Sequence, residues 1–164
     1  MEFGAVFWVD ELTRFTSSEA YNLFGQAERT GLVAWAFAYP TTTFTHPNMF
    51  RYFNYSAEKY QLFQMVEADR IIIYNTKDVH LNVMLPWVKC SLDIYCIAPL
   101  GAQFKGCNFT LKPKHLYAGC HMYDTSAFNV VLGKAFDFEQ PYVAVFDIFD
   151  IADPNSLQKN KQIL

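Results

Sequence analysis

The chain has 164 residues, of which 52% are hydrophobic and only 18% charged, and its formal net charge is −3. This composition is too apolar for a disordered protein, and an acidic balance without a basic run argues against nucleic-acid binding. We expect one β-rich globular domain over residues 1–154, long enough to form a core without disulfides or metals, and a short polar tail over residues 155–164.

The N-terminal part predicts a strand followed by a helix. Residues 3–9 form a short apolar run that is typical of a strand. Thr16 and Glu19 have the spacing of a capping box, which favours a helix over residues 16–30. Gly31 is a natural C-terminal stop for that helix.

The next stretch contains one clear strand and one ambiguous element. Residues 32–39 predict a strand in which large side chains alternate with alanines. Residues 49–53 alternate only weakly. Residues 56–68 fit a helix or a strand, and we favour the helix because most of these residues are good helix formers.

The centre of the chain, residues 70–101, predicts an antiparallel meander. Its strands are expected at 71–74, 79–85 and 92–98. The second strand has the cleanest alternation, because every other residue from position 79 to 85 is apolar and β-branched or leucine. Residues 75–78 have turn chemistry, so the first two strands should form a hairpin.

The C-terminal third predicts further strands. They are expected at 104–111, with a bulge at Gly106, and at 128–136 and 142–151, whereas residues 113–124 are expected to form a loop. The whole pattern favours a mainly β or α+β fold, an antiparallel β-sandwich resembling a jelly roll, with one or two helices packed on it.

The predicted cellular setting is the cytoplasm. The start of the chain has no basic region followed by a long apolar run, as a signal peptide would, and no apolar segment approaches the roughly 18 residues needed to cross a bilayer. Without a secretory signal the four cysteines are expected to be reduced thiols in the core.

Metal and cysteine chemistry have little support in the sequence. Cys107, His115, Cys120 and His121 lie within fifteen residues, but the spacing lacks a C-x2-C pair and adjacent side chains cannot easily share one tetrahedral site. We therefore expect no metal site, no cofactor and no catalytic cysteine, and we assign these side chains to the core or the surface.

A hydrolase is the weakest of the functional hypotheses. It would use Asp147 or Asp150 with one of three histidines, His80, His115 or His121. On a strand, however, residues three apart point to opposite faces, so the two carboxylates could hold one metal ion together only if a bulge intervened. We therefore lean towards a protein that is not an enzyme and name no catalytic residue.

Four fragments resemble the capsid proteins of picorna-like viruses. MFRYF at 49–53 resembles the aromatic-Arg-aromatic strand that begins their sheet, and LPWV at 85–88 with LDIYCIAPL at 92–100 resembles their late strands. HLYAG at 115–119 is similar to the end of their barrel. The resemblance implies a jelly roll, self-assembly and no catalysis, with the virion as a second location beside the cytoplasm.

The aromatic residues are the remaining functional signal. The chain has 16 Phe, 10 Tyr and 3 Trp, and such side chains concentrate in interfaces and ligand pockets. The candidates for either role are Trp8, Trp35, Tyr39, Trp87 and Tyr95.

Two hypotheses of function follow from composition and aromatic content. The first is a structural or interaction protein that assembles with copies of itself, or binds another protein, through aromatic β-sheet surfaces. The alternative is a soluble binding module with an aromatic-lined pocket for a small apolar ligand or a sugar.

Overall fold

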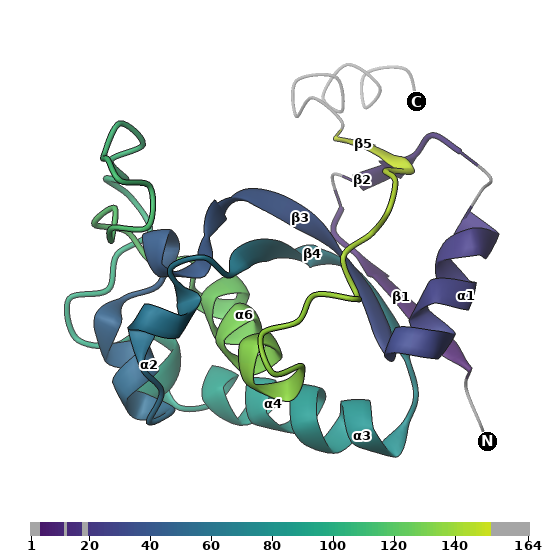
Figure 1. Cartoon of the computed structure of the whole chain (residues 1–164), viewed down its shortest axis with the longest axis horizontal. Helices are drawn as coiled ribbons and strands as arrows, with labels where there is room; N and C mark the ends of the chain where they lie inside the picture. Colours follow the sequence, from purple (N-terminus) through teal and green to yellow (C-terminus); the bar gives the residue numbers. More distant parts are fainter. Residues whose placement is uncertain (1–3, 12, 18–19, 152–164) are drawn as a thin grey trace, which may run out of the picture.

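A three-stranded antiparallel sheet lies at the centre of the molecule. The computed structural model describes residues 4–11, 13–17 and 20–151, the last two by their backbone alone (Figure 1). The sheet has the order β1-β4-β3, and β2 pairs with β5 in a separate two-stranded sheet. The strands are β1 (Ala5–Val9), β2 (Thr13–Phe15), β3 (Leu32–Pro40), β4 (Gln64–Tyr74) and β5 (Phe149–Ile151).

The fold class is mixed α and β with an antiparallel sheet, as the α+β form of the prediction has it. A full sandwich or jelly roll is not shown by the described residues, because the larger sheet has only three strands and carries helices on its faces. Three strand predictions are confirmed: β1 covers residues 5–9 of the run predicted at 3–9, β3 contains 32–39, and β4 contains 71–74.

The prediction of a helix over residues 56–68 is wrong. A short 3-10 turn at Ala57–Tyr60 precedes β4, which already begins at Gln64. Tertiary contacts override the helix propensity here: Met65 and Val66 are completely buried, and Val66 pairs with Ala36 of β3.

Helices cover both faces of the larger sheet. On one face Val33, Trp35 and Ile72 pack against α1 (Ala20–Thr30). On the other face Ala34 and Ile71 pack in the cluster that contains α6 (Tyr123–Ala135). The small alanine face of β3 thus accommodates a closely packed helix.

Helix α1 confirms the predicted helix from residue 20 to residue 30, but its expected start at Thr16 is wrong: Thr16 and Ser17 are not helical, and the Thr16 N–H donates to Ile148 O at 2.9 Å. Gly31 ends it with a φ of 88°, a conformation that favours glycine, and its N–H donates to Ala27 O at 2.7 Å. The Glu19 half of the expected capping box lies outside the described residues.

The strand predicted at 79–85 and the hairpin before it are wrong. Thr76 accepts a hydrogen bond from the Val79 N–H and begins one continuous helical segment. The segment consists of α3 (Lys77–Val79), a π-helical turn (His80–Met84) and α4 (Leu85–Ser91). Figure 1 shows α6 lying between this helical segment and the larger sheet.

The helical period separates side chains that a strand would have placed together. Val79 and Val83 are buried, whereas Leu81 and Leu85 are 45% and 36% exposed. The widened turn precedes Pro86, which has no N–H to donate and whose ring crowds the preceding turn of a regular helix.

Several other strand predictions also fail. Residues 92–98 contain α5 (Ile94–Ile97), residues 128–136 lie almost entirely in α6, and weakly alternating residues 49–53 overlap α2 (Pro47–Tyr52). Residues 104–111, all of them described, form turns and loop rather than a strand. Of residues 142–151 only the last three form a strand, while Val143 makes a single bridge to Ala34.

The expectation of reduced cysteines is also wrong. The four cysteines form two disulfides, Cys90–Cys96 and Cys107–Cys120. The first joins α4 to α5, and the second closes part of the long loop between α5 and α6. Among the described residues, no helix is both long and apolar enough to cross a bilayer.

Candidate functional site: an aromatic pocket beside an acidic cleft

A strongly apolar cavity lies where β3 ends and the long loop folds back over it. Its volume is about 420 Å³, and we call it the aromatic pocket. It is lined by Phe37, Phe44, Phe104, Lys105, Gly106, Cys107, Phe109 and Met122. Lys105 contributes the one charged side chain of this lining.

Phe44 forms the floor of the aromatic pocket. It belongs to the 3-10 turn Thr41–Phe44, which directly follows β3, and it is completely buried. Its ring centroid lies 5.6 Å from that of Phe37, 5.7 Å from Phe109 and 4.9 Å from Tyr39. Tilted and edge-on contacts of this kind stabilise the cluster beyond simple burial.

Backbone hydrogen bonds fix the loop against this turn. The Ala118 N–H donates to Thr43 O at 2.8 Å, and the Met122 N–H donates to Phe44 O at 3.0 Å. Within the loop the Asn108 N–H donates to Ala118 O at 2.8 Å. These bonds place the loop residues 104–109, which we call the outer wall of the aromatic pocket, opposite Phe44 on its floor.

The outer wall exposes apolar surface to solvent. Phe104 and Phe109 are each 60% exposed. Covering apolar surface is favourable by roughly 25 cal/mol of free energy for each Å² removed from water. A ligand seated between the two rings and Phe44 would cover part of this surface.

An acidic cleft adjoins the aromatic pocket. Phe37 and Met122 line both cavities, so the two are contiguous. The acidic cleft has a volume of about 300 Å³. Its other lining residues are Glu67, Ala68, Asp69, Asp124 and Thr125.

The surroundings of the acidic cleft disfavour the charged form of two of its carboxylates, Glu67 and Asp69. Partial loss of hydration raises the pKa of Asp69, and the nearby Asp10 and Asp124 carboxylates raise it further. Burial also raises the pKa of Glu67, although its hydrogen bond from Arg70 opposes the rise. A positive charge in the acidic cleft would therefore be favourable.

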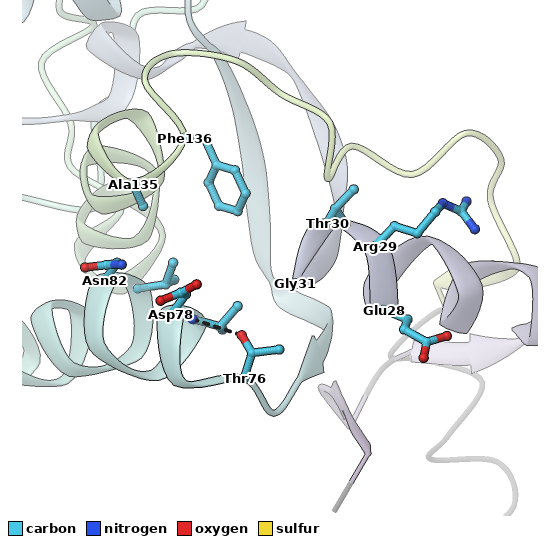
Figure 2. Close-up of a pocket in the computed structure, with 11 residues that line it drawn as sticks. Glu28, Arg29, Thr30, Gly31, Thr76, Asp78, Asn82, Ala135 and Phe136 are labelled. Atoms are coloured by element: carbon cyan, nitrogen blue, oxygen red, sulfur yellow. Dashed lines mark hydrogen bonds between the residues drawn. The ribbon is translucent and has the colours of Figure 1, made fainter.

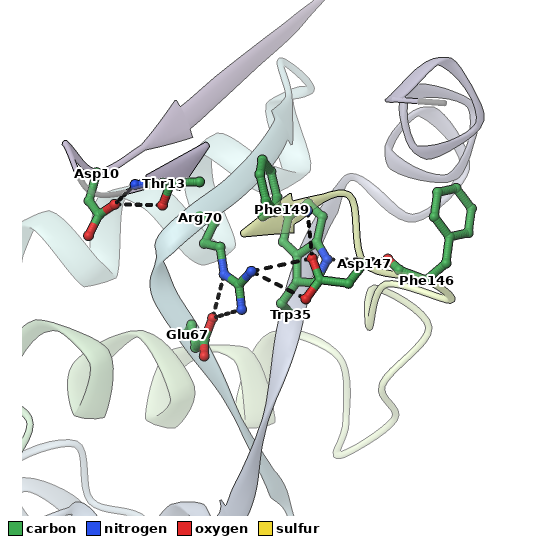
Figure 3. A network of polar contacts seen from close by, with 8 residues as sticks. All are labelled: Asp10, Thr13, Trp35, Glu67, Arg70, Phe146, Asp147 and Phe149. Atoms are coloured by element: carbon green, nitrogen blue, oxygen red, sulfur yellow. Dashed lines mark hydrogen bonds and ion pairs between the residues drawn. The ribbon is translucent and has the colours of Figure 1, made fainter. Parts of the chain in front are cut away.

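Arg70 does not neutralise the acidic cleft by itself, because two carboxylates share it. Figure 3 shows its guanidinium between Glu67, at 2.6 Å from Nε, and Asp147, at 3.3 Å from Nη1. The group also lies 5.8 Å from the ring centroid of Trp35 and 5.4 Å from that of Phe149. Arg70 thus joins β4 to the C-terminal segment in a mainly structural contact.

A second, more polar cavity of about 260 Å³ lies between α1, α3 and the end of α6. Figure 2 shows that the charged ends of Glu28 and Arg29 point away from Phe136, which lies across the pocket. Thr76 is occupied in capping α3. Converging polar groups are what a specific polar ligand requires, so we do not choose this cavity as the site.

The five aromatic candidates from the sequence do not come together. Trp8 on β1 is 59% exposed and Tyr95 on α5 is 80% exposed, at separate places. Trp35 is buried and donates from Nε1 to Phe146 O, and Trp87 donates to Asp124 O and packs on Phe128. Only Tyr39 lies beside the aromatic pocket, where its ring contacts Phe37, Phe44 and Phe109.

The residues considered for catalysis and metal binding are also dispersed. Asp147 pairs with Arg70, and the side chain of Asp150 lies outside the described part. His121 is buried against His46, while Cys107 and Cys120 are joined to each other. In the described ranges no three His, Cys, Asp or Glu side chains are placed to hold a metal ion.

The lining of the aromatic pocket could not be identified from the sequence. Phe104 and Phe109 lie in a stretch predicted as a strand, and Phe44 follows a threonine run with no functional signature. The useful signal was the pair of aromatics, Phe104 and Phe109, on either side of Gly106 and Cys107 in a segment, 104–114, that contains three lysines. Comparison with protein-family models, curated proteins and solved structures finds no match for this chain.

Proposed function

We propose that the protein is a binding module for a small organic molecule that has an apolar, preferably aromatic, body and a positively charged group. The observation that carries this proposal is the contiguity of the aromatic pocket with the acidic cleft through Phe37 and Met122. The apolar body would occupy the first cavity, and the cation would lie towards the second.

The dimensions and lining support a small ligand. Ligand pockets usually measure about 300–1,000 Å³ and have mainly hydrophobic walls with a few polar groups. The aromatic pocket falls within that range and its wall is almost entirely apolar. A sugar would need many hydrogen-bond partners, so the apolar ligand is the better supported of the two ligands expected from the sequence.

Electrostatics supports a cationic group on the ligand. Three carboxylates line the acidic cleft, whereas Arg70 is shared between Glu67 and Asp147. The faces of Phe37 and its neighbours would also attract a cation, because aromatic faces carry partial negative charge. Lys105 lines the aromatic pocket but not the acidic cleft, so it disfavours a cation in the pocket and favours one in the cleft.

Binding of phenyltrimethylammonium to the isotopically labelled protein tests this proposal by NMR. We expect amide shifts to change around Phe37, Met122 and the loop at 104–109, with an affinity of about millimolar for so small a ligand. Shifts spread over the whole surface, or confined to another cavity, would refute the assignment of the site.

A matched pair of variants isolates the acidic cleft. Asp69→Asn removes one exposed carboxylate that lines it, and Asp78→Asn removes an exposed carboxylate from α3 instead. We expect the first to weaken binding about threefold to tenfold and the second to leave it unchanged. Equal effects of the two variants would show that only net charge matters.

Self-association is a second proposal, favoured by an exposed stripe on the helical segment 77–91. Leu81, Leu85, Val88 and Leu92 are all at least 36% exposed and follow the 4-3-4 spacing of a coiled-coil seam. In an antiparallel two-fold pair Leu81 faces Leu92 and Leu85 faces Val88, so the stripe complements itself. Between positions 81 and 92 Lys89 alone is charged.

Light scattering tests this second proposal. We expect a mass near twice 19.0 kDa at about 100 μM, and the monomer mass for Val88→Asp. Val145→Asp, at an exposed position in another part of the surface, serves as the control and should remain dimeric. A monomer at every concentration would contradict self-association and leave ligand binding untouched.

A further inference from the structure

We propose that the Cys107–Cys120 disulfide is a redox latch on the aromatic pocket: its reduction releases the outer wall and abolishes ligand retention. The inference rests on the proposed function, because it assigns a means of control to the same site. The proposal has two parts, and the first, the release of the outer wall, can be tested without any ligand.

The disulfide connects the wall of the pocket to its buried base. Cys107 lines the pocket between Phe104 and Phe109. Cys120 is completely buried in the cluster that contains Phe44. The bond therefore ties the half of the loop that carries the exposed aromatics to the half that is fixed on the 3-10 turn.

Few other contacts hold the outer wall. Residues 101–122, all of them described, contain no helix or strand. The wall is joined to the rest by the Asn108–Ala118 backbone hydrogen bond, through Gln103 by bonds to Gly119 and His121, and by contacts of the Phe109 ring with Tyr39 and Phe44. Because these contacts are few and Phe104 and Phe109 are largely exposed, we expect the covalent link to make the largest contribution to keeping the wall in place.

The two disulfides differ in their accessibility to a reductant. Cys107 is only partly buried, so its Sγ can be approached from solvent. Cys90 and Cys96 are 1% and 0% exposed and belong to the main core. A reductant should therefore cleave the latch while the core disulfide remains intact.

The reaction requires a dithiol as co-reactant. One of its thiolates attacks Sγ of Cys107, a new S–S bond forms, and the electron pair of the old bond leaves on Sγ of Cys120, which takes up a proton. The second thiol of the reductant loses its proton and displaces the Sγ of Cys107, which leaves as a thiolate and takes up a proton. The protein gains two electrons and two protons, and the dithiol is oxidised to its own disulfide.

The test is a titration of the oxidised full-length chain with dithiothreitol. Free thiols are alkylated at each step and located by mass spectrometry, while phenyltrimethylammonium shifts and the exchange rate of the Asn108 amide are recorded. We expect Cys107 and Cys120 to be labelled at lower dithiothreitol concentration than Cys90 and Cys96. At that point the probe should bind at least tenfold more weakly, and the Asn108 amide should exchange at least tenfold faster.

Variants and outcomes separate the two proposals. Cys107→Ser with Cys120→Ser should reproduce the reduced state without dithiothreitol, and Cys90→Ala with Cys96→Ala should keep the response. Simultaneous labelling of all four cysteines, or an unchanged Asn108 exchange rate after selective reduction, would overturn the latch. Failure of the oxidised chain to bind the probe would instead refute the proposed function, and amide exchange would still decide the latch.

Discussion

His121 is the most strongly perturbed histidine of the described chain. Its side chain is completely buried. Its Nδ1 accepts from the His46 N–H at 3.1 Å, so Nε2 carries the proton and donates to Ile97 O at 3.1 Å. Burial lowers the pKa of His121 to about 4. The neutral ring therefore links the start of α2, the end of α5 and the end of the long loop.

Acid should weaken this three-way contact. The pKa of His121 is lower in the folded chain than its ordinary value of 6.5, so the unfolded chain binds the proton more strongly. The stabilisation from keeping His121 neutral is therefore complete above pH 6.5 and is lost as the pH falls towards 4. The free energy of unfolding should decrease by about 3 kcal/mol over this range.

Urea unfolding of the wild type and His121→Asn at pH 7 and pH 4.5 measures this effect. The asparagine oxygen can still accept from the His46 N–H but does not titrate. We expect the stability advantage of the wild type over the variant to shrink by about 2–3 kcal/mol at the lower pH. An advantage that does not depend on pH would show that His121 is protonated in the folded chain or is not buried.

Two helical glycines should respond to alanine in opposite directions. A Cβ at Gly133 would lie 2.5 Å from Cε1 of Tyr60, a buried ring whose hydroxyl donates to Val130 O. A Cβ at Gly25 would meet only Nη1 of Arg29, at 3.6 Å. The overpacking cost of about 1–3 kcal/mol at Gly133 exceeds the helix-propensity gain of up to about 1 kcal/mol.

Thermal or urea denaturation of Gly133→Ala and Gly25→Ala tests this contrast. We expect net destabilisation by about 1–2 kcal/mol for the first and stabilisation by about 0.5–1 kcal/mol for the second. If Gly133→Ala proved stabilising, Tyr60 would have to be free to move away from α6.

At the scale of elements, a side chain of α6 replaces a missing strand beside β4. The pairing of β1 with β4 ends at Arg70, so Val66 has no strand on that side. Instead Asn129 of α6 accepts from the Val66 N–H at 2.8 Å and donates to Val66 O at 2.7 Å. This exchange satisfies two buried backbone groups and fixes the helix against the sheet.

Asn129→Leu should remove that connection. Both Val66 backbone groups would lose their partner in the core, at about 1–3 kcal/mol each, which the added apolar contacts offset only in part. We expect the free energy of unfolding to fall by about 2–4 kcal/mol in urea. Asn22→Leu on the exposed face of α1 is the control, with an expected change below about 0.5 kcal/mol; similar losses in both variants would contradict this account.

The same elements show what the sequence could and could not predict. The short apolar run of β1, the alternation of large side chains with alanines in β3 and the β-branched run at the end of β4 were all predicted correctly. In α6 eight consecutive residues from Ser126 to Gly133 are buried, so its apolar pattern is equally consistent with a strand. Residues 79–85 of the segment 77–91 alternate like a strand because apolar residues lie on both its inner and its outer face. Only the packing against α6 determines which of these apolar residues are buried.

At the scale of the whole molecule, the sheet and its two covering helices support a site that is built from irregular structure. The aromatic pocket depends on a turn, a long loop and a disulfide, and none of the three has a periodic pattern. Its position could not be predicted from the sequence, because Phe109 is far from Phe37 and Phe44 along the chain and meets Phe44 only through a tertiary contact. The high aromatic content of 18%, which equals the low charged content, did indicate that a pocket or an interface should exist.

The central claim is that the ligand must be both apolar and positively charged. The most direct measurement compares three probes of similar size by NMR titration at low salt: phenyltrimethylammonium, its neutral isostere tert-butylbenzene, and benzenesulfonate. We predict that the initial shift per unit of probe at the Met122 amide is at least about fivefold larger for the cation than for the neutral probe and smallest for the anion, and that added salt reduces the difference. Equal responses to the cation and the neutral probe, or a stronger response to the anion, would contradict the account.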